Sequence, residues 1–232
     1  MKIKSTVAAL SAAVAVAGTL ALVSTSAQAA DCKHKVGSIL SLTGSYGAYG
    51  VPISKAAQMG VEQVNAARAA VGVGCDLTYD VRDSQTQASV AIDAATKMID
   101  IEGVTALVGP ISSGITAPLL SSVTVEKGVV LIATASTSPT FTKMGREGKT
   151  KGLFFRTLPA DTLQAVATAK LAWDVGIRKP AIIYLNNDWG KNNQAEFTAA
   201  FEAQGGKVVA AVAFNADQPS YRSVINKALK GG

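Results

Sequence analysis

Apolar and polar positions follow a repeating strand-and-helix pattern from residue 36 onward. Short apolar runs recur, and most are followed by longer stretches in which apolar residues return every three or four positions. The expected strands are 36–42, 77–81, 104–108, 129–132, 153–156, 181–185 and 207–214, and the expected helices are 52–70, 88–101, 112–126, 161–175, 192–204 and 219–229. Strands that alternate with helices predict an α/β fold with parallel sheets covered by helices on both faces.

Two interruptions divide this pattern. Residues 133–151 are rich in Ser, Thr and Gly, and we predict an irregular segment there. The second interruption is Thr157-Leu158-Pro159, after which the pattern starts again. We place a domain boundary at the second interruption. It predicts a first ligand-binding lobe at 31–157 and a partial second lobe at 158–232.

The first thirty residues are typical of a secretory signal peptide. Lys2 and Lys4 precede an apolar run at 7–23, and Ala27-Gln28-Ala29 supplies small residues for cleavage. A membrane anchor is the alternative, but a run of about 17 residues is at the short limit for a span. We therefore predict a signal peptide at 1–29. Its removal takes away two lysines and lowers the formal charge from +6 to +4.

The two cysteines of the chain, Cys32 and Cys75, would lie in an oxidising compartment after export. Each precedes an apolar, strand-like run, and adjacent parallel strands would bring both starts to one end of a sheet. An even pair in such a compartment is typical of a disulfide. We predict a Cys32–Cys75 bridge, with two free thiols as the alternative.

The loops that follow three of the expected strands have a shared composition. Residues 41–50, 109–114 and 133–139 are rich in small hydroxyl residues and contain no Lys, Arg, Asp or Glu. Ligands of open parallel sheets bind beyond the carboxyl ends of the strands, where hydroxyls and free backbone N–H groups attract anions. The absence of basic residues favours a carboxylate over a di- or triphosphate.

Signals of enzymatic activity are weak. Gly44, Gly47 and Gly50 have the spacing G-x-x-G-x-x-G, which is not the dinucleotide-binding pattern. No acid lies about 20 positions further on, and the candidates, Asp80 and Asp83, are about 30 positions past the last glycine. The single histidine precedes the first strand, far from the ligand end, so Ser112 and Ser113 have no evident base. Clustered metal ligands and a basic patch are also missing from the sequence. We predict a protein that is not an enzyme, uses no cofactor or metal, and binds no nucleic acid.

Five short segments in order carry a family resemblance. They are Ser41-Leu-Thr-Gly with Tyr49-Gly50, Val108-Gly-Pro-Ile-Ser-Ser-Gly with Ala117-Pro118, Ala133-Thr-Ala-Ser-Thr-Ser-Pro139, Phe155-Arg-Thr-Leu-Pro-Ala-Asp161 with Gln164, and Asn186-Asn-Asp-Trp-Gly190. From about residue 35 to its end, the chain resembles the periplasmic substrate-binding proteins of ABC transporters in the branched-chain amino acid (Leu/Ile/Val-binding) family. The resemblance implies a type I periplasmic-binding fold, with two lobes and a ligand in the cleft between them.

The resemblance also implies a set of ligand-binding residues. Ser113 and Thr137 match family positions that hold the carboxylate of the ligand, and helix or turn capping is the alternative role for both. The main-chain carbonyl of Ala135 matches the position that receives the ammonium group. The remaining residues of the predicted site are Ser136 of the same loop, Asp161, which faces the cleft region in the family, and the aromatic residues Tyr49 and Trp189.

The function implied by the resemblance is transport. The protein would capture a small amino acid or related carboxylate in the periplasm and deliver it to a membrane permease. Alternatives are a binder of another solute, such as an aromatic acid, an amide or urea, a sensory ligand-binding domain, and a secreted α/β hydrolase that uses Ser113.

The end of the sequence departs from the family pattern. In the family the second lobe continues with further strands and helices, and many members carry an acidic residue there for the ammonium group. We therefore expect a C-terminally truncated chain that binds ligand weakly and folds poorly. A sharp unfolding transition that ligand raises in temperature would contradict this expectation.

Overall fold

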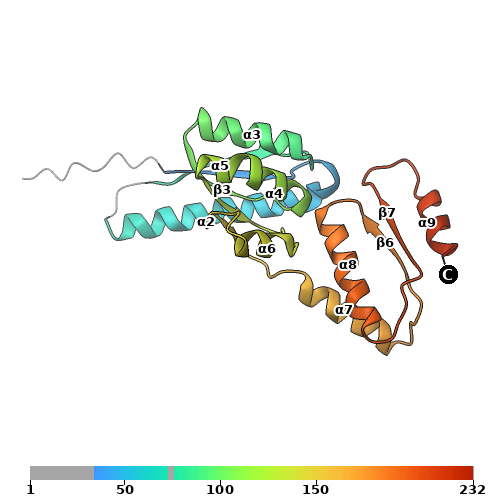
Figure 1. Ribbon diagram of the computed structural model, residues 1–232. Helices are drawn as coiled ribbons and strands as arrows, with labels where there is room; N and C mark the ends of the chain where they lie inside the picture. Colours follow the sequence, from blue (N-terminus) through green and yellow to red (C-terminus); the bar gives the residue numbers. More distant parts are fainter. Residues whose placement is uncertain (1–33, 73–75, 232) are drawn as a thin grey trace, which may run out of the picture. The chain divides into compact units, whose positions relative to one another are not determined.

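The computed structural model describes residues 34–72 and 76–231 (Figure 1). The predicted signal peptide and the predicted Cys32–Cys75 disulfide lie outside the described residues, so both stay predictions. Within the described ranges, no helix is both long enough and apolar enough to cross a membrane.

The first lobe, by which we mean residues 34–157, contains five parallel strands in the order β2-β1-β3-β4-β5. Because the strands are parallel, the loops that follow them gather at one edge of the sheet, where ligands bind in folds of this kind. The strands are β1 Lys35–Leu40, β2 Thr78–Asp83, β3 Val104–Val108, β4 Val130–Ala133 and β5 Phe154–Arg156.

Helices lie on both sides of the first-lobe sheet (Figure 1). Helix α2 (Gly47–Ala70), which follows the short 3-10 helix η1 (Gly44–Tyr46), packs against β1 and β2. On the other side, α3 (Ala88–Asp100) packs against a continuous helical segment made of α4 (Ser113–Leu119), the π-helix η2 (Leu120–Thr124) and α5 (Val125–Lys127). The π-helix follows Pro118, which has no N–H for a regular helical hydrogen bond.

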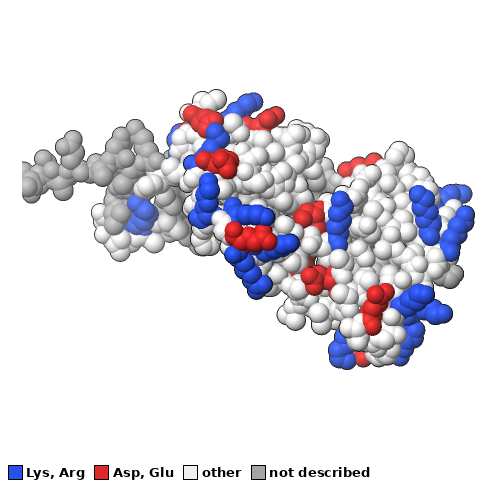
Figure 2. Space-filling model, in the orientation of Figure 1, with Lys and Arg blue, Asp and Glu red and all other residues white. Residues whose placement is uncertain are grey.

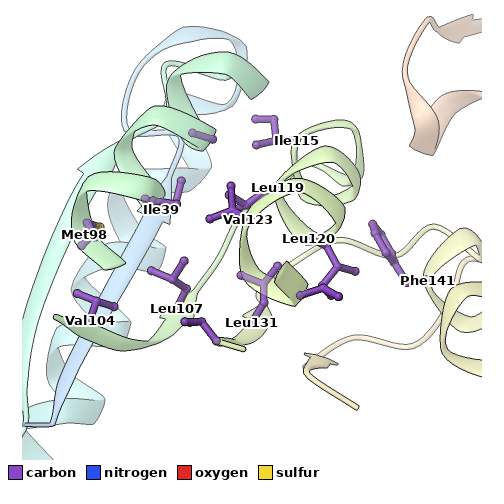
Figure 3. Close-up of a cluster of buried hydrophobic side chains, with 14 residues drawn as sticks. Ile39, Met98, Val104, Leu107, Ile115, Leu119, Leu120, Val123, Leu131 and Phe141 are labelled. Carbon is purple, nitrogen blue, oxygen red and sulfur yellow. The ribbon is translucent and has the colours of Figure 1, made fainter. Parts of the chain in front are cut away.

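The main hydrophobic core lies between the first-lobe sheet and its α3–α5 side. Figure 3 shows side chains from β1, α3, β3, η2 and β4 pointing toward one another. The large ones that are fully buried include Ile39, Met98, Leu107, Leu120 and Leu131. Burial of such a side chain stabilises a fold by about 1.5–3 kcal/mol. This core therefore fixes the strand ends from which the ligand loops project.

The second lobe, residues 158–231, has a smaller sheet. Strands β6 (Ala181–Leu185) and β7 (Ala210–Phe214) are parallel. Helices α7 (Thr162–Asp174) and α8 (Asp188–Glu202) pack together, α8 contacts β6, and α9 (Arg222–Leu229) contacts both strands. The prediction of an α/β fold with parallel sheets is confirmed in both lobes.

Several predicted boundaries differ from the observed ones. Helix α2 begins at Gly47, five residues before Pro52, and α8 begins at Asp188 rather than at residue 192. The segment 133–151, predicted to be irregular, contains α6 (Thr140–Arg146), so that prediction is wrong. The helix is held by Phe141, which is buried and stacks on Phe154 with ring centroids 4.8 Å apart.

Charged side chains of both signs are interspersed over the face that Figure 2 shows. Several lie in exposed ion pairs, such as Lys127 with Asp100 at 2.8 Å and Lys170 with Asp174 at 2.6 Å. Exposed pairs of this kind contribute little to stability. On this face of the described residues no extended basic surface is seen.

Candidate functional site

A pocket of about 320 Å³ lies where the two lobes meet. We call it the ligand pocket. Six of the seven predicted ligand-binding residues line it, namely Tyr49, Ser113, Ala135, Thr137, Asp161 and Trp189. Its other lining residues are Tyr46, Ile53, Ile111, Ser112, Leu158 and Gln164.

Asp83, the last residue of β2, holds the loop that follows β1. Its Oδ1 accepts hydrogen bonds from the backbone N–H groups of Leu42, Thr43 and Gln85 at 2.8, 3.2 and 2.8 Å, and its Oδ2 accepts one from Thr43 Oγ1 at 2.5 Å. Partial burial acts to raise the pKa of Asp83, but the hydrogen bonds outweigh it and hold the pKa below its usual value. Asp83, which lies too far along the sequence to serve a dinucleotide site, therefore positions the loop that leads to Tyr49.

Tyr49 and Trp189 reach the pocket from equivalent places in the two lobes. Each lies in the first turn of the helix that follows the first strand of its lobe, and each precedes a glycine. A Cβ on Gly50 would lie 1.8 Å from the carbonyl oxygen of Ser41, and one on Gly190 would lie 2.1 Å from that of Leu185. Only glycine allows these helices to approach the strand ends so closely, and this approach places both aromatic rings at the pocket.

Ser113 lies at the start of α4 and is almost fully buried. Its Oγ accepts a hydrogen bond from the backbone N–H of Ser138 at 3.3 Å. This bond links the loop after β3 to the loop after β4. A hydroxyl that accepts one bond still has its own proton to donate. Among the described residues no acceptor takes that proton, so it is available to an anion in the pocket.

Thr137 and Asp161 form the connection between the lobes at the pocket. Thr137 Oγ1 donates to Asp161 Oδ2 at 2.6 Å, and the backbone N–H of Asp161 donates to the carbonyl of Thr137 at 2.9 Å. Because a carboxylate only accepts, the Thr137 proton points to Asp161. In this conformation Thr137 presents a lone pair to the pocket, and binding a ligand carboxylate through its hydroxyl would require exchange of that bond.

Asp161 is the one charged side chain among the described residues that line the ligand pocket. It is only 6% exposed. The nearby Arg156 donates instead to the carbonyl of Ser138 at 2.9 Å and to Thr142 Oγ1 at 2.6 Å. Burial lowers the pKa of Arg156, and the charge of Asp161 opposes that shift. The pocket thus combines a buried carboxylate with neutral hydroxyls and apolar walls.

The structure places Ser136 away from the ligand pocket. Its Oγ lies 2.6 Å from Thr116 Oγ1 and within 3.4 Å of the carbonyls of Pro110 and Ile111, and the side chain is fully buried. Ala135 and Thr137, on either side of it, line the pocket, whereas Ser136 packs the loop onto α4.

Tyr46 is the aromatic pocket residue that sequence reasoning missed. It lies in the same Gly-rich loop as Tyr49, three residues earlier, and the two rings are 6.3 Å apart. Burial raises the pKa of Tyr46, the side chain of Asn187 partly offsets the rise, and Tyr49 adds to it. The tyrosine spacing was the available signal, but nothing in the loop indicates which of the two rings is the more buried.

His34 precedes β1, at the opposite end of the parallel sheet from Ser113, which follows β3. Within the described part of the chain, no group of three or more His, Cys, Asp or Glu side chains is placed to hold a metal ion.

Comparison with known proteins places this pocket in context. A family model described as "Periplasmic binding protein" matches residues 33–232. A Leu/Ile/Val-binding protein of Rhizobium johnstonii is 29% identical over 171 residues, which are 73% of this chain and 44% of that protein. The chain spans about half the length of the curated relatives it matches.

Solved structures show the same fold. A leucine-binding protein of Thermotoga maritima has a TM-score of 0.73 at 22% identity, with 85% of this chain and 53% of that one covered. A solute-binding protein of R. palustris, solved in complex with 4-hydroxybenzoate, has a TM-score of 0.69 at 22% identity, with 86% and 52% covered. Similarity at this level of identity concerns the fold alone.

Proposed function

Because the chain belongs to the periplasmic binding protein family, we propose that it is the solute-binding component of an ABC transporter. Its ligand would be a small amino acid with an apolar side chain, bound as the zwitterion in the ligand pocket. The predicted signal peptide supports a periplasmic location, and the family supports a membrane permease as the partner that receives the ligand.

The observation that carries this proposal is the charge of the pocket. Asp161 is a buried carboxylate, and no Lys or Arg lines the pocket with it. A simple carboxylic acid would bring a second negative charge beside Asp161, which is unfavourable in a partly desolvated site. An amino acid brings an ammonium group for Asp161 together with its carboxylate, so the bound pair of charges is balanced.

The placement of the polar groups supports one orientation of the ligand. The free proton of Ser113 would be donated to the α-carboxylate, as the family resemblance implies. Asp161, the lone pair of Thr137 and the carbonyl of Ala135 would accept hydrogen bonds from the ammonium group. Hydrogen bonds to charged groups contribute about 1.5–3 kcal/mol each.

The apolar part of the pocket supports an apolar ligand side chain. Tyr49 and Trp189 face it from the two lobes, and Ile53, Ile111 and Leu158 complete the walls. A pocket of mostly apolar walls with a few polar groups is typical of small-molecule sites. A branched-chain amino acid, which the named relative from Rhizobium johnstonii binds, fits this chemistry.

An aromatic acid is a second candidate ligand. Three aromatic rings, those of Tyr46, Tyr49 and Trp189, line the pocket and offer stacking surfaces. The R. palustris structure with 4-hydroxybenzoate has the same fold. The charge of Asp161 argues against an acid that carries no ammonium group, and a direct comparison of the two ligand classes decides between them.

Calorimetry of the chain at millimolar ligand tests the proposal. Leucine should bind at least about tenfold more tightly than 4-hydroxybenzoate, the margin of one charge-assisted hydrogen bond. Ser113→Ala should weaken the affinity for leucine by a similar factor. Ser121 is an exposed serine on η2, and Ser121→Ala should leave that affinity unchanged. Preference for 4-hydroxybenzoate would favour the second candidate, and binding of neither would contradict both.

A further inference from the structure

A second cavity of about 260 Å³ adjoins the ligand pocket. Side-chain amides and hydroxyls dominate its walls, and no Lys or Arg lines it. We call it the amide chamber. Its polar residues include Gln85, Gln87, Asn186, Asn187, Asn215 and Asp217. Tyr46 and Ser112 line both cavities, so they form the wall between them.

Tyr46 is held in this wall from several directions. Its backbone N–H donates to Thr86 Oγ1 at 3.3 Å, and its ring lies 6.3 Å from that of Tyr49. The side chain of Asn187 in the second lobe acts on its hydroxyl and lowers its pKa, against the rise that burial causes. The Oδ1 of Asn187 in turn accepts from the backbone N–H of Gly190 at 2.8 Å, which fixes the amide at the start of α8.

The two cavities differ in what they would bind. The ligand pocket has apolar walls around one carboxylate, whereas the amide chamber offers hydrogen-bond donors and acceptors. Some of these groups already pair across the chamber, as Asn186 Nδ2 does with Asn215 Oδ1 at 3.0 Å. A ligand with a polar group at the end of a longer side chain would find partners in the chamber if the way to it were open.

We propose that Tyr46 sets the length limit of the ligand by closing the ligand pocket off from the amide chamber. This inference rests on the proposed function, because it concerns the side chain of an amino acid bound in the pocket. With the ring in place, the pocket accepts a short apolar side chain. Without it, the two cavities join, and a longer side chain that ends in an amide or a urea group gains both space and hydrogen-bond partners.

The test is a calorimetric comparison of leucine, glutamine and citrulline, whose side chains grow in length and polarity. The wild-type chain should bind leucine at least tenfold more tightly than citrulline. Tyr46→Ala should reverse or abolish that preference. Tyr46→Phe, which keeps the ring and loses only the hydroxyl, should keep the wild-type order.

Tyr49→Ala is the matched control. Tyr49 lines the ligand pocket but not the amide chamber, so its loss should weaken all three ligands and leave their order unchanged. If Tyr46→Ala does not fold, as judged by circular dichroism, Tyr46→Leu replaces it and should narrow the preference for leucine.

The outcomes distinguish failure of the length limit from failure of the proposed function. A wild type that binds leucine, together with a Tyr46→Ala variant that keeps the same preference over citrulline, overturns the length limit alone. If Tyr49→Ala also reverses the preference for leucine over citrulline, the effect comes from general loosening of the pocket. That result would also overturn the role of Tyr46 in limiting ligand length. A wild type that binds none of the three amino acids overturns the proposed function and the length limit together.

Discussion

The two lobes have the same arrangement of strands and helices around the pocket, but their strands differ in how deeply they are buried. In each, a first strand leads into a helix that presents an aromatic residue to the pocket, and a second strand pairs in parallel with the first. Strand β1 is paired on both edges and its last four residues are buried, whereas β6 is paired to β7 alone among the described residues, with Ile183 43% exposed.

This difference assigns separate roles to the lobes. The first lobe supplies a packed base for Ser113 and Thr137, because its core lies directly beneath their loops. The second lobe supplies Asp161 and Trp189 on a smaller base, in which Phe201 is the one large, fully buried side chain among its described residues. We expect the first lobe to carry most of the stability and the second to respond more readily to ligand.

The largest expected effect comes from the first-lobe core. Leu107→Ala removes a fully buried side chain and should cost about 2–5 kcal/mol, whereas Ile183→Ala, at a half-exposed site of β6, should cost less than about 1 kcal/mol. Urea unfolding followed by circular dichroism measures both. Equal losses would contradict the comparison of the lobes.

Tryptophan fluorescence sharpens the same comparison. Both tryptophans, Trp173 and Trp189, lie in the second lobe. If that lobe is the less stable one, the fluorescence change should occur at lower urea than the change in circular dichroism. Coincident transitions would mean that the two lobes unfold as a unit.

The glycines beside the pocket aromatics are expected to have the next largest effect. Gly50→Ala and Gly190→Ala would each press a methyl group into a backbone carbonyl and should cost about 1–3 kcal/mol, with the greater loss at Gly50, where the surrounding lobe is better packed. Gly60→Ala is the control, because no atom lies within 4 Å of its Cβ position on α2, and it should stabilise by about 0.5–1 kcal/mol. A loss at Gly60 comparable with that at Gly50 would contradict the close-approach explanation.

The smallest expected effect is the pH dependence due to Asp83. Its pKa is lower in the folded state, so its charge stabilises the fold above about pH 4, and this contribution is lost as pH falls through the folded-state pKa. Asp83→Asn should reduce the melting temperature at pH 7 and have less effect at pH 3. Asp93→Asn, on α3 outside this loop, is the control, and the same pH dependence there would refute a specific role for Asp83.

The sequence predicted the elements best where chemistry marks both ends. The strands at 104–108 and 181–185 have the predicted bounds, because the first apolar run is enclosed by Gly103 and Gly109 and the second by Pro180 and Asn186. Helix α6 was missed because tertiary packing of Phe141 holds it rather than a periodic pattern of its own. The start of α2 was missed because Pro52 suggested a first turn, although the helix tolerates it in the second.

The sequence predicted which residues line the pocket better than it predicted the hydrogen bonds between them. Family-like segments identified six of the pocket residues, but the pairing of Thr137 with Asp161 depends on how the chain crosses between lobes. Asp83 had no assigned role, since its partners are backbone N–H groups that carry no sequence signal. The expectation of weak ligand binding by this chain stays a prediction.

The central claim, capture of a zwitterion through Asp161, is tested most directly by comparing leucine with 4-methylpentanoate, which is leucine without its ammonium group. Calorimetry of the wild-type chain should show a preference for leucine of about 10–100-fold, the value of one charge-assisted hydrogen bond. Asp161→Asn, which can still accept the bond from Thr137, should bring the two affinities close together. Equal binding of both ligands by the wild type, or an unchanged preference in Asp161→Asn, would contradict the account.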